Sequence, residues 1–238
     1  MPIISVAGQK GGAGKSTTAL SLAAEYHARG LRVLVVDADD EQRTALTWGD
    51  VADEAEIAAP PVIRMGDAIR TQLPALAAPY EVVLIDCPGR NGRRTAFALG
   101  LSDLAILPIG PTGPEIWTVR ATLDQVADVQ AIRPYLDAAI LITRKQPGTV
   151  IGNRARAALE ACECDVLDTE VHYRVGYGEA ITAGRGPTTY EPASDAAHEI
   201  RALADEVARR LTRRGAWPLP ASSTTPTTRR RRKLHAVK

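Results

Sequence analysis

The 238 residues of this chain predict an α/β protein in which a doubly wound, mostly parallel sheet carries helices on both faces. Short runs of Val, Ile, Leu and Ala alternate with segments whose apolar residues recur at helical spacing, which is the order of βαβ units. The apolar runs are nearly continuous, as in strands that are buried on both faces. Connections between such units are short and right-handed, so the strands are expected to join one sheet.

Five apolar runs are predicted to be strands. They occupy residues 3–7, 32–36, 82–85, 104–109 and 138–142. The alternation continues from residue 1 to residue 215 without an internal repeat. One doubly wound unit, the size of a single large domain, is therefore expected.

Three helices have the clearest apolar stripes. The first begins near Ser16 and ends at Gly30, and the second begins near Glu115. The third begins after Ser194, whose hydroxyl is suited to cap it, and ends at Gly215. Its last turns carry four arginines, Arg209, Arg210, Arg213 and Arg214.

Charge divides the chain into an acidic body and a basic end. Residues 216–238 hold six cations and no acid, and subtracting them from the net charge of +1 leaves residues 1–215 at −5. Pro, Ser and Thr dominate 219–228, which predicts a disordered tail with a basic cluster at its far end, Arg229, Arg230, Arg231, Arg232 and Lys233. We expect a folded domain over 1–215 and a disordered basic tail over 216–238.

Composition argues against several classes of protein. No stretch approaches the roughly 18 consecutive apolar residues of a membrane span, and no secretory signal opens the sequence. Three cysteines, Cys87, Cys162 and Cys164, are too few for a disulfide framework. A reduced, cytoplasmic protein without a membrane span is expected.

A glycine-rich segment directly follows the first predicted strand. Residues 10–17 have the sequence Lys-Gly-Gly-Ala-Gly-Lys-Ser-Thr. Glycines let backbone N–H groups converge on phosphate oxygens, and the next helix offers the partial positive charge of its N-terminus. Lys15 is suited to neutralise the β- and γ-phosphates, and the Ser16 hydroxyl to bind Mg²⁺. The predicted phosphate-binding residues are Lys10, Gly11, Gly12, Ala13, Gly14, Lys15, Ser16 and Thr17.

The usual pattern of a phosphate loop is not fully met, because Gln9 stands where that pattern has its first glycine. The sequence context nevertheless favours a ligand site, since a strand precedes the segment and a helix follows it. The fold expected is therefore that of the phosphate-loop nucleoside triphosphatases.

Two further strands end in carboxylates. Asp37 and Asp39 are spaced i, i+2 at the end of the second predicted strand, so both side chains can point the same way. Asp86 ends the strand 82–85 and is suited to be a second metal-binding motif. It is followed by Cys87, Pro88 and Gly89, which resemble the small-residue γ-phosphate switch of the ParA/MinD family of ATPases.

The loop with its additional lysine, Lys10, resembles the deviant phosphate loop of the ParA/MinD family of ATPases. The resemblance implies an ATP-bound sandwich dimer in which Lys10 reaches the phosphates held by the other subunit, the task of an arginine finger. It also implies that Asp37 supports Mg²⁺ together with Ser16 and Asp86, and that Asp39 orients the attacking water. The predicted catalytic residues are Lys10, Lys15 and Asp39. Where the family usually continues with Pro-Gln, this chain has Asp40, Glu41 and Gln42.

The resemblance covers about residues 1–212 and is greatest to short partition ATPases of the ParF type. Residues 141–145 are similar to the segment that enters the base-binding region, so Thr143 and Arg144, with the strand end at 108–111, are candidates to line the adenine pocket. Glu179, Gly184, Pro187 and the helix after Ser194 follow the family's C-terminal layout.

The implied function is ATP-driven segregation of DNA, with ATP and Mg²⁺ as cofactors. Dimers would bind duplex DNA irrespective of sequence and hydrolysis would release it, stimulated by a ParB-type centromere-binding protein, on the nucleoid in the cytoplasm. The four arginines of the last helix and the tail cluster are the candidate DNA contacts. A basic end on an acidic body is suited to contact DNA phosphates without reading the bases. The alternative for these cations is that they complement the helix dipole and solubilise the chain.

Other readings of the resemblance remain open. A MinD-like or other cargo-positioning ATPase would use the same site, although the tail has a poor amphipathic moment for a membrane. A nucleotide switch would make hydrolysis incidental, and a ligase of the dethiobiotin synthetase type would need a carboxylic substrate pocket. An iron–sulfur protein would need more than the three cysteines, which are better suited as small buried side chains.

Overall fold

The computed structural model describes residues 1–89 and 92–217. The predicted tail from residue 218 onward, with its cluster Arg229–Lys233, lies outside the described residues. Ala216 and Trp217 pack against the core, and the rings of Trp217 and Tyr26 lie 4.9 Å apart between centroids. The packed part of the chain therefore continues two residues past Gly215.

Seven strands form one parallel sheet, in the order β3-β2-β4-β1-β5-β6-β7. The strands are β1 Ile3–Val6, β2 Val33–Asp37, β3 Val62–Arg64, β4 Val82–Asp86, β5 Leu104–Ile109, β6 Asp137–Ile142 and β7 Asp165–Val166. The predicted fold class is confirmed, and all five predicted strands are present within two residues of their expected ends. β3 and β7 escaped prediction because strands of three and two residues at the sheet edges are too short to show a pattern.

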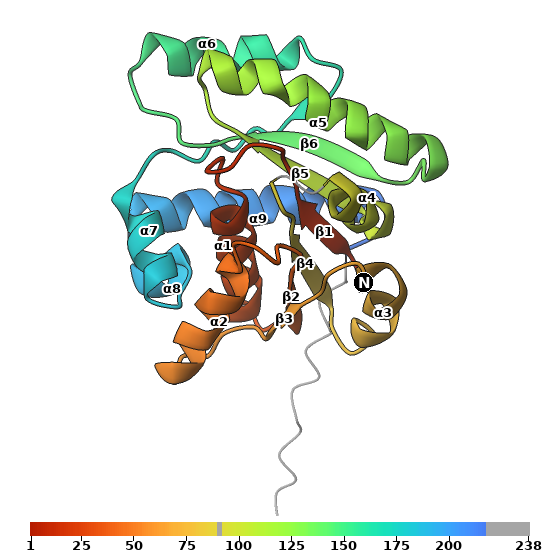
Figure 1. Ribbon diagram of the computed structural model, residues 1–238. Helices are drawn as coiled ribbons and strands as arrows, with labels where there is room; N and C mark the ends of the chain where they lie inside the picture. Colours follow the sequence, from red (N-terminus) through yellow and green to blue (C-terminus); the bar gives the residue numbers. More distant parts are fainter. Residues whose placement is uncertain (90–91, 218–238) are drawn as a thin grey trace, which may run out of the picture.

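Helices cover both faces of the sheet, as Figure 1 shows. One face carries α1 Lys15–Ala28, α2 Thr44–Glu54, α7 Val175–Thr182, α8 Pro187–Tyr190 and α9 Asp195–Arg213. The other carries α3 Ile69–Leu76, α4 Gly92–Leu101, α5 Gly113–Ile132 and α6 Val150–Glu160. Two apolar cores, one on each side of the sheet, bury the central strands β1, β2, β4 and β5 completely, whereas the edge strands β3 and β7 are partly exposed.

The ends of the predicted helices follow from local chemistry. The Ser194 hydroxyl accepts a hydrogen bond from the Ala197 N–H at 3.2 Å, which confirms it as the cap of α9. Gly30 and Gly215 adopt φ values of 87° and 71° just beyond α1 and α9, a conformation that glycine reaches without strain.

The strand order places the ends of β4, β1 and β5 side by side. β1 lies between β4 and β5, and the chain moves to one side of β1 through β2 and to the other side through β5. In such sheets a ligand crevice opens outside the carboxyl ends of the strands where the direction changes. The segments after β1, β2, β4 and β6 meet at the carboxyl ends of the strands, and we call this side of the sheet the carboxyl edge. The opposite edge is the amino edge. Within the described ranges, no helix is long and apolar enough to cross a bilayer.

Candidate nucleotide-binding site

The glycine-rich loop after β1 has the backbone that the sequence predicted for a phosphate cradle. Gly12 and Gly14 have φ values of 74° and 93°, where a side chain would strain the backbone. Gly14 directly precedes α1, so the N-terminus of that helix points into the crevice. A dipole end with free N–H groups favours an anion at this position.

Side chains from the end of β6 hold the loop from the other side. The Thr143 hydroxyl donates to the Ala13 carbonyl at 2.9 Å, and the Arg144 guanidinium donates to the Gly12 carbonyl at 2.8 Å. Both residues line the crevice, but their polar groups brace the loop. The strand end 108–111, the other candidate for the adenine pocket, is absent from the described residues that line the crevice.

Lys15 joins the loop to the segment after β4. Its ammonium donates to the Lys10 carbonyl at 3.0 Å. A Cβ atom at Gly89 would lie 3.2 Å from the same ammonium, so Gly89 permits this close approach. The predicted phosphate lysine and the predicted γ-phosphate segment therefore lie together.

Asp86, at the end of β4 beside Ser16 and Lys15 of the crevice, is the carboxyl group of the candidate site whose pKa is raised most. It is 2 % exposed, and its Oδ1 atom has no hydrogen-bond partner among the described residues. Burial raises its pKa from 3.8 to about 7, against the hydrogen bond from the Ser16 hydroxyl. An orphaned carboxylate oxygen beside a hydroxyl is the oxygen donor set that Mg²⁺ prefers when phosphates and water complete its shell. Ser16 and Asp86 thus fit the magnesium ion that the fold implies.

The two carboxylates after β2 differ in their surroundings. Asp37 is fully buried, and its two oxygens accept the N–H groups of Asp39 and Leu46, each at 2.9 Å. Burial raises its pKa. Asp39 lines the crevice, and its Oδ1 accepts from the N–H groups of Glu41 and Gln42. Asp37 therefore shapes the turn that presents Asp39, even without the Pro-Gln of the family.

The crevice has a volume of about 1060 Å³, ample for a nucleotide. One wall of it was not predicted from the sequence. The segment between β7 and α7 and the first turn of α7 contribute Val171, His172, Tyr173, Arg174, Val175, Tyr177 and Gly178. It carries no phosphate or metal motif, and contacts with distant parts of the chain, such as the pairing of His172 with Lys145, bring it to the site.

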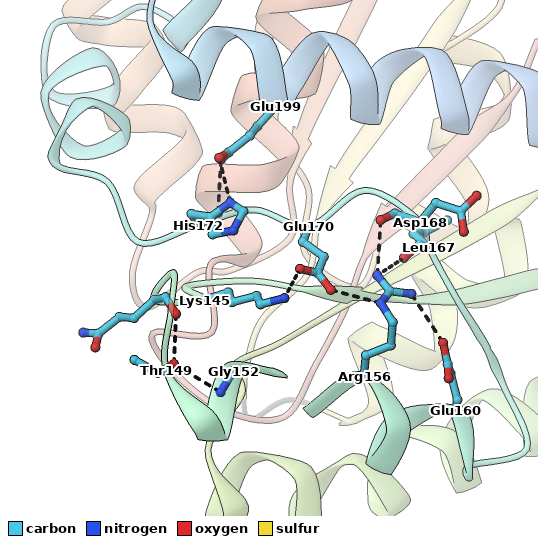
Figure 2. A network of polar contacts seen from close by, with 11 residues as sticks. Lys145, Thr149, Gly152, Arg156, Glu160, Leu167, Asp168, Glu170, His172 and Glu199 are labelled. Atoms are coloured by element: carbon cyan, nitrogen blue, oxygen red, sulfur yellow. Dashed lines mark hydrogen bonds and ion pairs between the residues drawn. The ribbon is translucent and has the colours of Figure 1, made fainter. Parts of the chain in front are cut away.

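Charged pairs fasten this wall, as Figure 2 shows. The Glu170 carboxylate contacts the Lys145 ammonium on one side and accepts from Arg156 Nε at 3.0 Å on the other. Although burial opposes it, these two cations lower the pKa of Glu170. His172 donates its backbone N–H to Glu199 of α9 at 3.1 Å, and its Nδ1 lies 2.8 Å from the same carboxylate. Through Glu170, directly before it, and through His172, the wall is thus tied to the segment after β6, to α6 and to α9.

Lys10 does not line the crevice of its own chain among the described residues. Its ammonium contacts Glu115 Oε1 at 3.0 Å, in the first turn of α5. Its side chain is 44 % exposed. The two lysines of the loop therefore face different ways.

The arginines of α9 lie at the amino edge. Arg210 contacts Asp137, at the start of β6, at 2.5 and 2.8 Å, and Asp165 at 2.8 Å. Arg214 donates to the Tyr135 carbonyl at 3.1 Å. Arg209 and Arg213 are exposed and form no ion pair within the part of the chain that is described. Of the four predicted DNA contacts, Arg210 is held by the fold, whereas Arg209 and Arg213 face solvent.

The geometry defines a class of protein: an α/β phosphate-loop protein with a nucleoside triphosphate and Mg²⁺ site at the carboxyl edge. Residues 4–188 match the family described as the CobQ/CobB/MinD/ParA nucleotide binding domain. The chain belongs to this family, and it is an ATPase of the ParA/MinD group.

Among curated relatives, the chain is 27 % identical over 185 residues to the maintenance of carboxysome distribution protein A of Halothiobacillus neapolitanus, covering 76 % of this chain and 84 % of that protein. It is 28 % identical over 238 residues to the chromosome-partitioning ATPase Soj of Thermus thermophilus, covering 87 % and 96 %.

Solved structures share the fold. Cobyrinic acid a,c-diamide synthase of Mycobacterium smegmatis, with a bound ATP analog and magnesium, superposes with a TM-score of 0.73 at 21 % identity, covering 93 % of this chain and 100 % of that one. The McdA(D38A)–ATP complex of Cyanothece superposes with a TM-score of 0.71 at 15 % identity, covering 93 % and 99 %.

Proposed function

We propose that the protein is a ParA-type partition ATPase that dimerises with ATP, binds DNA without sequence preference and hydrolyses ATP to drive DNA segregation. The observation that carries the proposal is the position of Lys10. Its ammonium lies outside the crevice of its own chain, at the carboxyl edge, where it is available to a second copy. A cation brought across a dimer interface stabilises the charge of phosphoryl transfer.

The surface around the crevice supports the dimer. Large apolar side chains are exposed on segments that begin or run at the carboxyl edge, namely Trp117, Val150, Ile151, Tyr173 and Val175, with Trp117 77 % and Val175 71 % exposed. Exposed apolar groups gathered around one site favour burial against a partner. A second copy that covered this edge would also close the crevice over ATP.

Within this proposal each residue has a role. Lys15 and the loop 10–17 hold the phosphates, while Ser16, Asp37 and Asp86 hold or support Mg²⁺, which would neutralise phosphate charge. Asp39, presented by its turn, orients the attacking water. Thr143 and Arg144 brace the loop and line the base side of the crevice.

DNA is the proposed cargo because cations collect at one place on an acidic body. Arg209, Arg213 and Arg214 are exposed at the end of α9, directly before the tail with its further cations. The resemblance to partition ATPases implies that a ParB-type centromere-binding protein would stimulate turnover. The ATP-bound dimer would then reside on the nucleoid.

A cargo other than DNA is the second candidate. The similarity to a carboxysome distribution protein favours it, because that relative is named for positioning a protein assembly. The two candidates share the ATP-dependent dimer and differ in what the dimer carries.

Light scattering of the purified chain with Mg²⁺-ATP and with Mg²⁺-ADP tests the dimer. ATP should produce a dimer and ADP should not. Lys10→Ala should lose the dimer or its turnover while still binding nucleotide. Arg154→Ala, which removes an exposed cation on α6, is the matched control. A wild-type chain that stays monomeric with every nucleotide would refute the proposal.

A salt titration of duplex DNA binding tests the cargo. Each phosphate neutralised by Lys or Arg contributes about −0.9 to the slope of log affinity against log salt. Deleting residues 219–238, which carry six cations, should reduce the slope by roughly two to four units, the change expected when only some of these cations meet phosphates. A wild-type protein that ignores DNA with ATP at low salt would favour the protein cargo.

A further inference from the structure

Glu115 has an unusual position for a carboxylate. It lies in the first turn of α5, is only 6 % exposed, and belongs to none of the motifs that the sequence predicts. Its Oε1 atom lies 3.0 Å from Lys10 Nζ and 3.6 Å from Arg144 Nη1. Its Oε2 atom is buried without a hydrogen-bond partner in the described ranges. Two cations of the nucleotide site thus converge on one carboxylate oxygen.

The backbone is shaped to seat this carboxylate. A Cβ atom at Gly110, just after β5, would lie 1.9 Å from Glu115 Oε2 and 2.7 Å from its Cδ. No side chain other than that of glycine leaves this space open. The carboxylate therefore occupies a defined seat, and Lys10, on a loop 105 residues earlier in the chain, comes to it.

We propose that Glu115 is a positioning residue that keeps Lys10 on its own subunit until a second ATP-bound copy offers its phosphates. The proposal rests on the proposed function, in which Lys10 acts across a dimer. Dimerisation then requires an exchange of partners by the Lys10 ammonium, from one carboxylate to a triphosphate of higher charge. ADP lacks the γ-phosphate and offers less charge for the exchange.

Arg144 makes the exchange possible without leaving a buried charge alone. Its guanidinium is already 3.6 Å from Glu115 Oε1 and bonded to the Gly12 carbonyl. When Lys10 leaves, Arg144 remains as the cation next to the carboxylate. An uncompensated buried carboxylate would otherwise be strongly unfavourable.

The first test measures the dimer dissociation constant of the full chain at saturating Mg²⁺-ATP. Glu115→Gln retains the shape of the side chain but removes the charge that holds Lys10. An ion pair with one exposed partner changes an equilibrium roughly two- to fivefold, and two such contacts open for each dimer. The dissociation constant of Glu115→Gln should therefore fall by roughly 4- to 25-fold.

Two variants accompany this test. Glu163→Gln makes the same charge change at an exposed position and should leave the dissociation constant unchanged. Gly110→Ala displaces the carboxylate by its Cβ atom without changing any charge and should act in the same direction as Glu115→Gln. If the wild type dimerises and both Glu115→Gln and Gly110→Ala dimerise with the same constant, the proposal is overturned while the dimer model survives.

The second test needs no dimer. Acetylation of the nucleotide-free protein with an N-hydroxysuccinimide ester, read by mass spectrometry, reports how freely the Lys10 ammonium reacts. Lys10 should react severalfold faster in Glu115→Gln than in the wild type, whereas the rate at Lys145, which is paired with Glu170, should not change. Equal rates at Lys10 in the two proteins would overturn the resting contact itself. A wild type that never dimerises but shows the faster Lys10 reaction would refute the proposed function and retain the contact.

Discussion

The carboxyl edge and the amino edge of the sheet differ in how their buried carboxylates are partnered. At the carboxyl edge, the buried oxygens Asp86 Oδ1 and Glu115 Oε2 have no hydrogen-bond partner among the residues described. At the amino edge, the Arg210 guanidinium contacts Asp137 and Asp165, and Arg29 contacts Glu25 and Asp205 at 2.7 and 2.6 Å. The carboxyl edge also holds ion pairs, such as that of Glu170 with Lys145, but it is the edge at which these two buried carboxylate oxygens lack a partner among the described residues.

This difference separates charges that serve a ligand from charges that serve the fold. An unpaired buried carboxylate destabilises a protein, so it is retained where a bound group supplies the missing partner. The charge of a paired carboxylate is already compensated by a cation of the same chain. The same criterion divides the arginines of α9, since Arg210 is part of the fold and Arg213 is free to meet a partner.

Asp39→Ala should slow ATP turnover at least about 100-fold and leave ATP binding intact, because a residue that orients or activates the attacking water contributes about 10²- to 10⁴-fold. Steady-state phosphate release and nucleotide binding measure the two effects. Asp39→Asn keeps the acceptor for the N–H groups of Glu41 and Gln42, so it separates loss of charge from loss of the turn. Asp50→Ala, at an exposed carboxylate of α2 that does not line the crevice, is the control. Normal turnover in both Asp39 variants would remove Asp39 from the mechanism.

Asp86→Asn should stabilise the protein in the absence of Mg²⁺ and nucleotide by roughly 2–4 kcal/mol at pH 8. The folded pKa of Asp86 is raised from 3.8 to about 7, so the folded state binds a proton that the unfolded state lacks between these values. Wild-type stability therefore falls as the pH rises from 4 to 7, and Asp86→Asn removes this loss.

Urea unfolding at pH 8 and at pH 4.5, with a chelator present, measures the difference for Asp86→Asn. The gain should shrink towards zero at the lower pH. A gain of equal size at both pH values would show that the carboxylate is not strained by burial. The Asp86 site would then not differ from the amino edge, where cations compensate the carboxylates.

Arg210→Ala should destabilise the fold by roughly 1–3 kcal/mol, because it leaves the Asp137 carboxylate, at the buried start of β6, without its bidentate partner. Arg210→Lys should recover only part of this loss, since an ammonium cannot reproduce the guanidinium fork. Urea unfolding measures both. An unchanged free energy of unfolding in Arg210→Ala would contradict its assignment to the fold.

Arg213→Ala should have the smallest effect on stability, and its main effect should be on DNA binding. Its stability should stay within about 0.5 kcal/mol of the wild type, since the side chain is exposed. The slope of DNA affinity against salt should decrease by about 0.9 if the side chain meets one phosphate. A salt titration of the ATP-bound protein measures it. An unchanged slope would place the DNA contacts elsewhere on the surface.

Much of the site could be predicted because its motifs are local. The loop 10–17, the cap at Ser194 and the strand ending in Asp86 each depend on neighbours within a few residues, where spacing and residue type carry the information. A second contact of Thr143 could not be predicted in this way. Its candidacy for the base pocket stays a prediction, while its hydroxyl also donates to the Ala13 carbonyl 130 residues away.

By itself the sequence determined the parallel α/β fold, the phosphate loop with its two lysines and the carboxylates at the strand ends, because periodicity and short motifs are properties of contiguous residues. Tertiary structure decided which distant groups meet: Glu115 with Lys10, Arg210 with Asp137 and Asp165, and the wall 171–178 with the loop. The physical reason lies in the parallel sheet. Its crossovers bring the ends of strands far apart in the chain to one edge, and which side chains touch there depends on strand order and register.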